Sequence, residues 1–167
     1  MVKEDSNSEN LLYDERSAGG IAYRIENGKI EWLLIKTVAN SKTNKSYVFK
    51  FPKGHLQKNE FLKQAALREV EEEGRIKAVI VDKIGSNNYV IFDKLKNKKI
   101  IKKVTFFLME FVSQSNLKYY DMELVLDRVW VSFEEATKML AYESERVLLQ
   151  KARAKLEALL KNQKAVK

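Results

Sequence analysis

The sequence predicts a mixed α/β (α+β) fold in one domain, and three observations support this. Short runs of β-branched and aromatic residues recur along the chain with turn residues between them, which is typical of strands. Two longer segments, near residues 60–73 and 144–160, have the apolar spacing of helices. The length of 167 residues suits one domain, and no internal repeat divides it. Many strands with few helices favour a sheet covered by helices.

The overall composition is that of a soluble globular protein. Hydrophobic residues make up 45% and charged residues 32% of the chain, which excludes wholesale disorder and collagen-like repeats. No apolar run approaches the roughly 20 residues that span a bilayer, and the N-terminus has no signal-peptide core. We therefore expect a cytoplasmic protein with no membrane partner.

The lack of cysteine and the single histidine limit the chemistry. Without cysteine, disulfide scaffolds, thiolate zinc sites and thiol nucleophiles are excluded. His55 is the only histidine, so a Ser-His-Asp triad or a histidine-rich metal site is hard to build. A metal would be held mainly by oxygen, which points to Mg²⁺, Mn²⁺ or Ca²⁺.

The charge balance points to an anionic partner. Lys and Arg number 31 against 23 Asp and Glu, a net charge of +8, and 24 of the basic residues are lysines. Lysine is a compact point charge that suits phosphate. A nucleotide, an inositol phosphate or RNA would fit, and solubility alone is the alternative explanation. The sequence carries no signal for an oligomeric state.

The predicted strands fill most of the chain. We expect a flexible arm over residues 1–16, the domain over residues 17–160 and a basic tail over residues 161–167. Strands are predicted at residues 17–24, 31–37, 47–51, 76–84, 89–92, 100–112 and 129–131. Asn27-Gly28, between the first two strands, is the strongest hairpin signal because both positions tolerate a positive φ.

The first predicted helix lies in the middle of the chain. It runs from about Glu60 to Glu73, with Asn59 as its N-cap and Gly74 as the αL residue that ends it. The segment before it, residues 52–56, is predicted to be a loop that begins at the only proline.

Two more helices are predicted near the C-terminus. Ser132 caps a helix that begins at Phe133, and Glu135 completes a capping box. The last helix covers about residues 144–160.

The buried face of the central helix changes from apolar to acidic. Its apolar stripe comprises Phe61, Leu62, Ala65, Ala66 and Val70. Glu69, Glu72 and Glu73 follow at i, i+3 and i+4, so their side chains converge within that stripe. Glu71 projects towards solvent. The helix therefore presents hydrocarbon inward at its start and three carboxylates inward at its end.

Two interpretations of this acidic cluster stay open. An acidic run on a helix is usually a solvated face. Carboxylates this close repel one another, however, and at the rim of a core a cation would neutralise them. Oxygen ligands select hard ions, and Mg²⁺ shares its shell with substrate phosphates. Arg68, four residues before Glu72, is placed to hold one of the carboxylates.

These residues reproduce most of a known signature. Gly54, five residues, Glu60, seven residues and then the run from Arg68 to Glu73 resemble the Nudix box, G-x5-E-x7-R-E-U-x-E-E-x-G-U, in which U is aliphatic. Ile76 fills the last U. The resemblance covers residues 17–150, with further matching segments at residues 18–20, 51–55, 103–108 and 130–136.

One position departs from the signature. The box has glycine at position 75, whereas this sequence has Gly74-Arg75. We expect the helix to stop one residue earlier, because Gly74 accepts the αL conformation.

The resemblance implies a fold and a reaction. The Nudix fold is an α/β/α sandwich with a mixed sheet, in which the box forms a loop-helix-loop motif. The reaction is the Mg²⁺- or Mn²⁺-dependent hydrolysis of a nucleoside diphosphate linked to another group. By the same resemblance, Glu72 and Glu73 are metal ligands, Glu69 binds metal or activates water, and Arg68 orients the glutamates.

The resemblance also implies supporting residues. Gly54 supplies backbone room and a carbonyl near the metal, and Glu60 a supporting contact or an outer ligand. A further acidic ligand often lies downstream in this family. Asp121 and Glu123 are the candidates, with Glu123 preferred, and an ordinary polar loop is the alternative.

Several residues are candidates for substrate binding. The segment that contains Lys53 and His55 resembles the box entrance of the subgroup acting on diadenosine polyphosphates and diphosphoinositol polyphosphates. Lys53 is placed to contact phosphate, and His55 contacts phosphate or caps the loop. Lys103 is the preferred phosphate contact within a lysine-rich hairpin, which is otherwise a solvated turn. Tyr89 stacks on a base or belongs to the core.

Three functions stay open. The preferred one is a dinucleoside polyphosphate hydrolase that cuts diadenosine tetraphosphate or a longer relative. The second is another Nudix pyrophosphatase, acting on nucleoside triphosphates including oxidised forms, on inositol pyrophosphates or on RNA 5′ ends. The third is a Nudix module that binds a nucleotide without cleaving it.

Overall fold

A mixed β-sheet forms the centre of the molecule. The computed structural model describes residues 15–39, 47–118 and 125–165. Its elements are β1 (Glu15–Glu26), β2 (Lys29–Val38), β3 (Tyr47–Lys50), β4 (Lys53–His55), α2 (Leu62–Gly74), β5 (Ile76–Asp93), β6 (Lys98–Gln114), β7 (Val125–Val131), α3 (Phe133–Met139) and α4 (Glu143–Ala165). Within these residues, no helix has the length and apolar character needed to cross a membrane.

The strands pair in the order β3-β2-β1-β6-β5, with β4 beside β1 and β7 beside β2. β1 and β6 run parallel, and the other pairs are antiparallel. The sheet is therefore mixed, as predicted. The hairpin at Asn27-Gly28 is confirmed, with φ of 51° and 76° at these residues.

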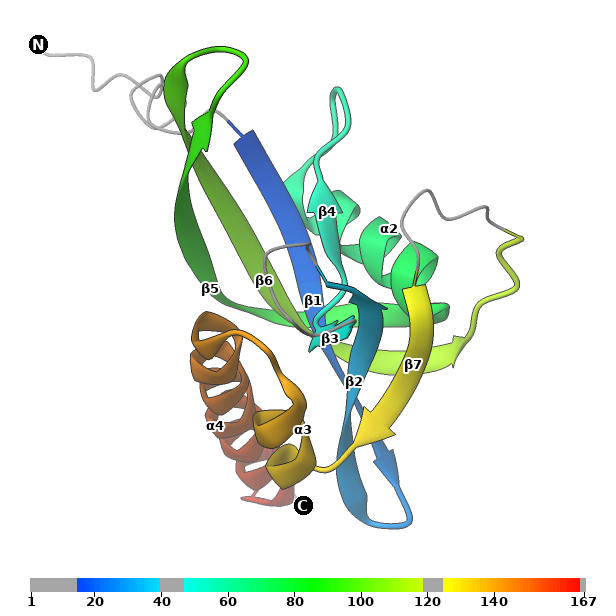
Figure 1. The fold of residues 1–167 in the computed structure, drawn as a ribbon. Coiled ribbons are helices and arrows are strands. Elements are labelled where there is room, and N and C mark those ends of the chain that lie inside the picture. The colour runs from blue at the N-terminus through cyan, green and yellow to red at the C-terminus, as the bar shows by residue number, and fades with distance from the viewer. Residues whose placement is uncertain (1–14, 40–46, 119–124, 166–167) are drawn as a thin grey trace, which may run out of the picture.

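Helices cover both faces of the sheet (Figure 1). α2 packs on one face, and α3 and α4 pack on the other. The core under α2 contains Ala65, Ala66 and Val70, which belong to the predicted apolar stripe. The predicted α/β/α sandwich is confirmed.

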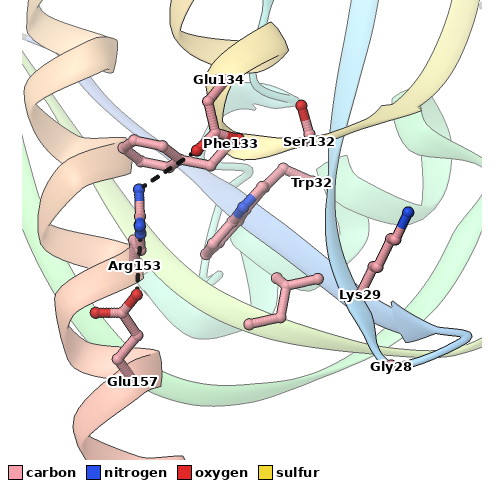
Figure 2. A pocket seen from close by; sticks show the side chains of 9 residues that line it. Gly28, Lys29, Trp32, Ser132, Phe133, Glu134, Arg153 and Glu157 are labelled. Carbon is pink, nitrogen blue, oxygen red and sulfur yellow. Dashed lines mark hydrogen bonds and ion pairs between the residues drawn. The ribbon is translucent and has the colours of Figure 1, made fainter.

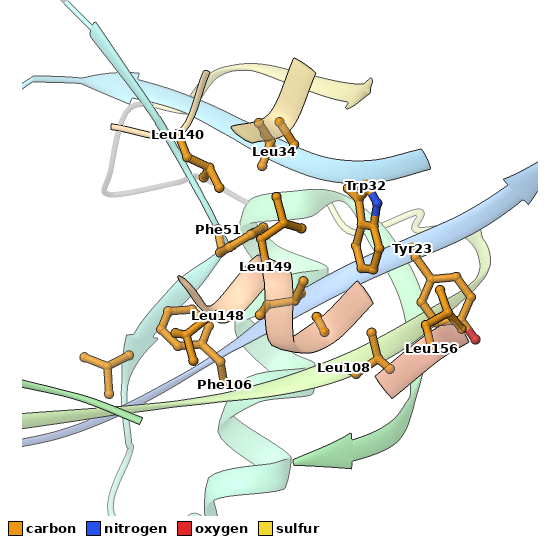
Figure 3. Close-up of a cluster of buried hydrophobic side chains, with 14 residues drawn as sticks. Tyr23, Trp32, Leu34, Phe51, Phe106, Leu108, Leu140, Leu148, Leu149 and Leu156 are labelled. Atoms are coloured by element: carbon orange, nitrogen blue, oxygen red, sulfur yellow. The ribbon is translucent and has the colours of Figure 1, made fainter. Parts of the chain in front are cut away.

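The core under α3 and α4 is the larger of the two (Figure 3). Leu148, Leu149 and Leu156 of α4 belong to this core together with Trp32 and Phe51, and Leu156 lies at the Tyr23 end of it. The three leucines, Trp32 and Phe51 are at most 2% exposed. This packing holds α4 against the strands that precede the central helix.

Two strand predictions were wrong. Residues 76–84 and 89–92 belong to one long strand, β5, which carries three register shifts before Gly85. Residues 53–55 form a strand, β4, rather than part of a loop, because they pair with residues 17–19 of β1. A strand of three residues forms only because it pairs with β1, so the local sequence has no pattern that predicts it.

The boundaries predicted for the central helix were also wrong. Asn59 has φ 62°, whereas an N-cap residue needs extended dihedrals, and Phe61 takes that position with φ −85° and ψ 157°. Gly74 is the last helical residue, and Arg75 adopts the αL conformation with φ 58°. A Cβ on Gly74 would lie 2.9 Å from Leu33 Cδ2. Glycine is therefore needed at position 74 because Leu33 leaves no room for a side chain, and not because the residue adopts the αL conformation.

The last two helices agree better with the prediction. Ser132 caps α3, and its side chain accepts a hydrogen bond from the Glu135 amide while the Glu135 carboxylate accepts one from Ser132 N. α4 extends to Ala165, past the expected end near Leu160.

Candidate active site

α2 carries the acidic cluster at the edge of its buried face. Glu69 and Glu73 are 9% and 6% exposed, and the side chain of Glu72 is 21% exposed. Val70, beside them, is fully buried in the core under the helix. The glutamates therefore lie at the rim of a core, as the helical spacing predicted, and not on a solvated face.

Arg68 joins the acidic residues into one network. Its guanidinium makes two hydrogen bonds to Glu60 (Nε–Oε1 2.7 Å and Nη2–Oε2 3.0 Å). Nη1 donates to Glu69 Oε1 at 2.8 Å and to Glu72 Oε2 at 3.1 Å, and Nη2 donates to the carbonyl of His55 at 3.0 Å. All five N–H groups of the guanidinium therefore donate a hydrogen bond. These bonds hold the carboxylates of Glu60, Glu69 and Glu72 in fixed positions.

This network changes the titration of its members. The hydrogen bond from Arg68 lowers the pKa of Glu60 below its ordinary value, and the same bond raises the pKa of Arg68. Glu60 therefore stays ionised and serves as the support for Arg68, in agreement with the supporting contact expected for it.

β4 brings the backbone of the preceding segment against the cluster. Lys53 N donates to Glu73 Oε2 at 3.0 Å. A Cβ on Gly54 would lie 2.2 Å from Glu69 Oε1 and 2.3 Å from Glu69 Cδ, so only glycine leaves room for this carboxylate. The predicted residues Gly54, Glu69 and Glu73 are thus brought together by a strand that the sequence did not reveal.

The donor set of this site fits a hard divalent cation. Glu69, Glu72, Glu73 and the carbonyl of Gly54 offer only oxygen, which Mg²⁺ and Mn²⁺ prefer. In the part of the chain that the structure describes, no three acidic or histidine side chains are already arranged as a metal cage. The guanidinium of Arg68 instead bridges Glu69 and Glu72 and offsets part of their charge. Asp121 and Glu123, the candidates for a downstream ligand, lie outside the described residues.

Three of the predicted substrate residues lie on the other face of the sheet, towards α4. Side chains alternate along strands, so Lys53 and His55 face away from Gly54 and Glu69. Lys53 Nζ lies 5.4 Å from the centroid of the Tyr89 ring. His55 Nδ1 lies 3.3 Å from Ser17 Oγ. The structure thus brings Lys53 close to Tyr89, and His55 lies on the same face beside Ser17.

Lys103 does not join this group. It pairs in register with Arg16, and its neighbours at alternate positions, Phe107 and Met109, belong to the core under α2. Its side chain therefore belongs to the α2 face. Lys102, paired in register with Tyr89, is the lysine on the α4 face. The alternation of side chains along β6 could have shown from the sequence that Lys102, and not Lys103, faces α4.

The prediction also missed Glu145, which is only 1% exposed. Its Oε1 accepts a hydrogen bond from Phe51 N at 2.8 Å. Burial raises the pKa of this carboxyl to about 7, although the Phe51 bond and the charges of Lys53 and Lys50 act in the opposite direction. Locally Glu145 resembles any acidic residue in the first turn of a helix, so the sequence offers no signal for its burial.

Two pockets lie near these elements. One, of about 690 Å³, opens beside Glu60 between α2 and the sheet and is lined by Leu56, Phe61 and Phe107. The other, of about 340 Å³, lies at the opposite end of the sheet between α3, α4 and the first hairpin (Figure 2). Arg153 lines this second pocket and is paired with Glu157 at 3.0 Å, so its charge is already balanced.

In this α/β/α sandwich, Arg68 of α2 binds Glu60, Glu69 and Glu72, and Gly54 of β4 packs against the Glu69 carboxylate. Comparison with known proteins shows the family. The model of the NUDIX domain matches residues 15–152. The chain belongs to this family, the Nudix hydrolases.

The similar proteins include hydrolases of dinucleoside polyphosphates. The bis(5′-nucleosyl)-tetraphosphatase (asymmetrical) of Sus scrofa is 29% identical over 81% of this chain and 90% of its own length. The crystal structure of an Ap4A hydrolase from C. elegans has a TM-score of 0.59 at 28% identity, over 85% of this chain and 98% of that one. The protein named MutT4 of Mycobacterium tuberculosis is also 29% identical, over 83% of this chain, but the chain spans only about half (54%) of that relative.

Proposed function

We propose that the chain hydrolyses a phosphoanhydride in a nucleoside diphosphate linked to a further group, with Mg²⁺ or Mn²⁺, and that diadenosine tetraphosphate or a similar dinucleoside polyphosphate is its substrate. One observation carries the proposal. Arg68 holds Glu60, Glu69 and Glu72 on one guanidinium, beside the bond between Lys53 N and Glu73. Such a preorganised group of carboxylates is suited to a reaction in which positioning and charge supply most of the rate.

The residues of the chain have separate parts in this reaction. Glu69, Glu72 and Glu73, with the Gly54 carbonyl, would hold a divalent cation, which supplies positive charge to the phosphate oxygens when bound. Arg68 keeps the carboxylates in place and limits their mutual repulsion. Glu69, which is nearly buried against Gly54, is the proposed general base, a role typically worth ~10²–10⁴-fold.

The α4 face supports a nucleotide as substrate. A lysine beside an aromatic ring, as in the Lys53–Tyr89 contact, suits a phosphate next to a base. Lys102 and His55 lie on the same face and are proposed as further phosphate contacts, whereas Lys103 faces away from them. The Ap4A hydrolases among the similar proteins favour a dinucleoside polyphosphate over a single nucleotide.

Two other functions are alternatives within this proposal. Lysines 94, 96, 98 and 99 at the tip of the β5–β6 hairpin would also suit a longer polyanion, such as a diphosphoinositol polyphosphate or an RNA 5′ end. A nucleoside triphosphate, including an oxidised one, belongs to the same class of substrates. A module that binds nucleotide without cleavage is less consistent with the site, because a sensor need not keep carboxylates that repel one another.

We also propose a cytoplasmic location and a single catalytic domain. Its expected bounds of residues 17–160 are too narrow, because β1 begins at Glu15 and α4 continues to Ala165.

A hydrolysis panel tests the proposal. The chain is incubated with Mg²⁺ or Mn²⁺ and with dinucleoside polyphosphates, nucleoside triphosphates, an inositol pyrophosphate, and capped or triphosphorylated RNA. Release of ATP and AMP from diadenosine tetraphosphate would support the preferred substrate. Rapid release from RNA with no turnover of diadenosine tetraphosphate would replace it. Calorimetric binding of nucleotide without any product would point to the binding module.

A further inference from the structure

Glu145 is the most deeply buried acidic residue in the described part of the chain, and it lies outside the acidic cluster. It belongs to the first turn of α4, on the face of the sheet opposite α2. Oε1 accepts from Phe51 N at 2.8 Å, and Oε2 is buried with no hydrogen-bond partner in the described structure. A carboxylate in this state is unfavourable, because burial removes water without replacing all of its hydrogen bonds.

The partner of Glu145 stands directly before the segment that shapes the active site. Phe51 is fully buried and packs edge-on against Phe106, with the ring centroids 6.1 Å apart. Pro52, the next residue, accepts a hydrogen bond from Gly20 N at 3.1 Å. Lys53 then donates to Glu73. The chain from Phe51 to Lys53 is therefore held by a hydrogen bond at every residue.

The segment continues across the acidic cluster. Gly54 lies against the carboxylate of Glu69, and the carbonyl of His55 accepts from Arg68. A displacement that begins at Phe51 would thus reach the backbone that contacts Glu69, Glu73 and Arg68. Displacements of about 1 Å in such a site lower the rate by up to about 10²-fold.

We propose that Glu145 is a positioning residue for hydrolysis. Through the Phe51 amide it fixes the Lys53–Gly54 backbone against Glu73 and Glu69 on the far face of the sheet. The inference rests on the proposed function, since it assigns a role within the same site. A second hydrogen bond, from Ala141 N to Phe49 O at 3.1 Å, fixes β3 just before Phe51. Loss of the Glu145 bond would therefore affect the segment that follows Phe51 more than β3.

Three variants of the full chain test this role. Glu145→Ala removes the acceptor of the Phe51 amide. Glu145→Gln keeps an acceptor oxygen at the same place. Leu156→Ala makes a cavity in the same helix and core, far along α4 from Phe51, and is the control for lost stability alone. For each variant we would measure Tm, kcat and KM, the Kd for Mn²⁺, and hydrogen exchange of the peptide covering residues 49–55.

We expect Glu145→Ala to lower kcat by about 10²-fold, more than it changes KM, to weaken Mn²⁺ binding, and to speed amide exchange at Phe51 and Lys53 by about tenfold or more. Glu145→Gln should restore most of each quantity. Leu156→Ala should lower Tm while kcat and Mn²⁺ binding stay near wild type at temperatures where it is folded.

The inference is overturned if Glu145→Ala, while folded, keeps the wild-type kcat and Mn²⁺ affinity, or if Leu156→Ala loses both to the same extent. It is equally overturned if exchange in residues 49–55 does not change. The proposed function fails separately: if the wild-type chain cleaves no member of the panel, the exchange and Mn²⁺ measurements still decide whether Glu145 fixes the segment.

Discussion

The backbone amide of Lys53 donates a hydrogen bond to the Glu73 carboxylate, with N and Oε2 3.0 Å apart, while the Lys53 side chain lies on the other face of the sheet near Tyr89. One residue therefore joins the acidic cluster to the face proposed for the nucleotide. Replacing the side chain leaves the amide in place, so mutation can separate the proposed nucleotide contact of Lys53 from its hydrogen bond to the acidic cluster.

Glu72→Gln should lower kcat by ~10²-fold or more with a small change in Tm, because the variant keeps the shape of Glu72 but loses its charge. Steady-state kinetics with Mg²⁺ would check it. Glu71→Gln is the matched control, since Glu71 accepts from Ser115 Oγ at 2.8 Å and an amide oxygen can accept the same bond. Equal activity of the two variants would contradict the ligand role of Glu72.

Gly54→Ala should lower kcat by about 10²-fold, because the added Cβ overlaps the Glu69 carboxylate and forces it to move. Gly85→Ala is the control, because its Cβ would approach only the flexible end of Leu148, at 3.1 Å. Wild-type kinetics for Gly54→Ala would show that the position of Glu69 does not matter for turnover.

Arg68→Lys should destabilise the fold by about 1–3 kcal/mol and reduce kcat, because an ammonium group cannot reproduce the forked bonds to Glu60 while also reaching Glu69 and Glu72. Thermal and urea unfolding would measure the loss. Arg153→Lys, at an exposed pair with Glu157, should change the stability by less than about 0.5 kcal/mol. A similar Tm for both variants would contradict a structural role for the Arg68 network.

The stability of the wild-type chain should fall as the pH rises from about 4.5 to about 7. Glu145 binds its proton more tightly in the folded state, where its pKa is raised to about 7 from 4.5, so its stabilising contribution is complete below 4.5 and is lost by pH 7. Lys50 and Lys53 oppose the shift without removing it. The pKa of Glu60 is lowered in the folded state. Its contribution to stability is therefore complete above the ordinary pKa of a glutamate and is lost only as the pH falls below that value.

Unfolding curves across this pH range would test the assignment to Glu145. Glu145→Gln should remove most of the slope between pH 4.5 and 7, because an amide does not titrate. Glu143→Gln, in the same turn of α4 but with a side chain 76% exposed, should keep it. An unchanged slope in Glu145→Gln would assign the pH dependence to another group.

The features that local sequence determines were predicted well. The capping box at Ser132 and the turn at Asn27-Gly28 depend on neighbouring residues only, and both are present. The placement of Glu69 and Glu73 at the rim of a core also follows from helical spacing. The predicted convergence of Glu69, Glu72 and Glu73 is not seen as a metal-holding group among the described residues, because the Arg68 guanidinium lies between Glu69 and Glu72.

The features that depend on distant residues were missed. Gly74 is the last residue of the helix and leaves no room for a Cβ beside Leu33, and Arg75 takes the αL conformation instead. The burial of Glu145 depends on Phe51, 94 residues earlier in the chain. Neither relation leaves a trace in the local sequence, so periodicity and capping rules could not predict them.

β4 is only three residues long, so the direction of each of its side chains depends on one pairing register with β1. Gly54 faces the carboxylates because it sits between Lys53 and His55, whose side chains project to the opposite surface. Inserting or deleting one residue here would turn every side chain over. A bulky side chain would then press on the Glu69 carboxylate, and Lys53 and His55 would leave the face proposed for the nucleotide.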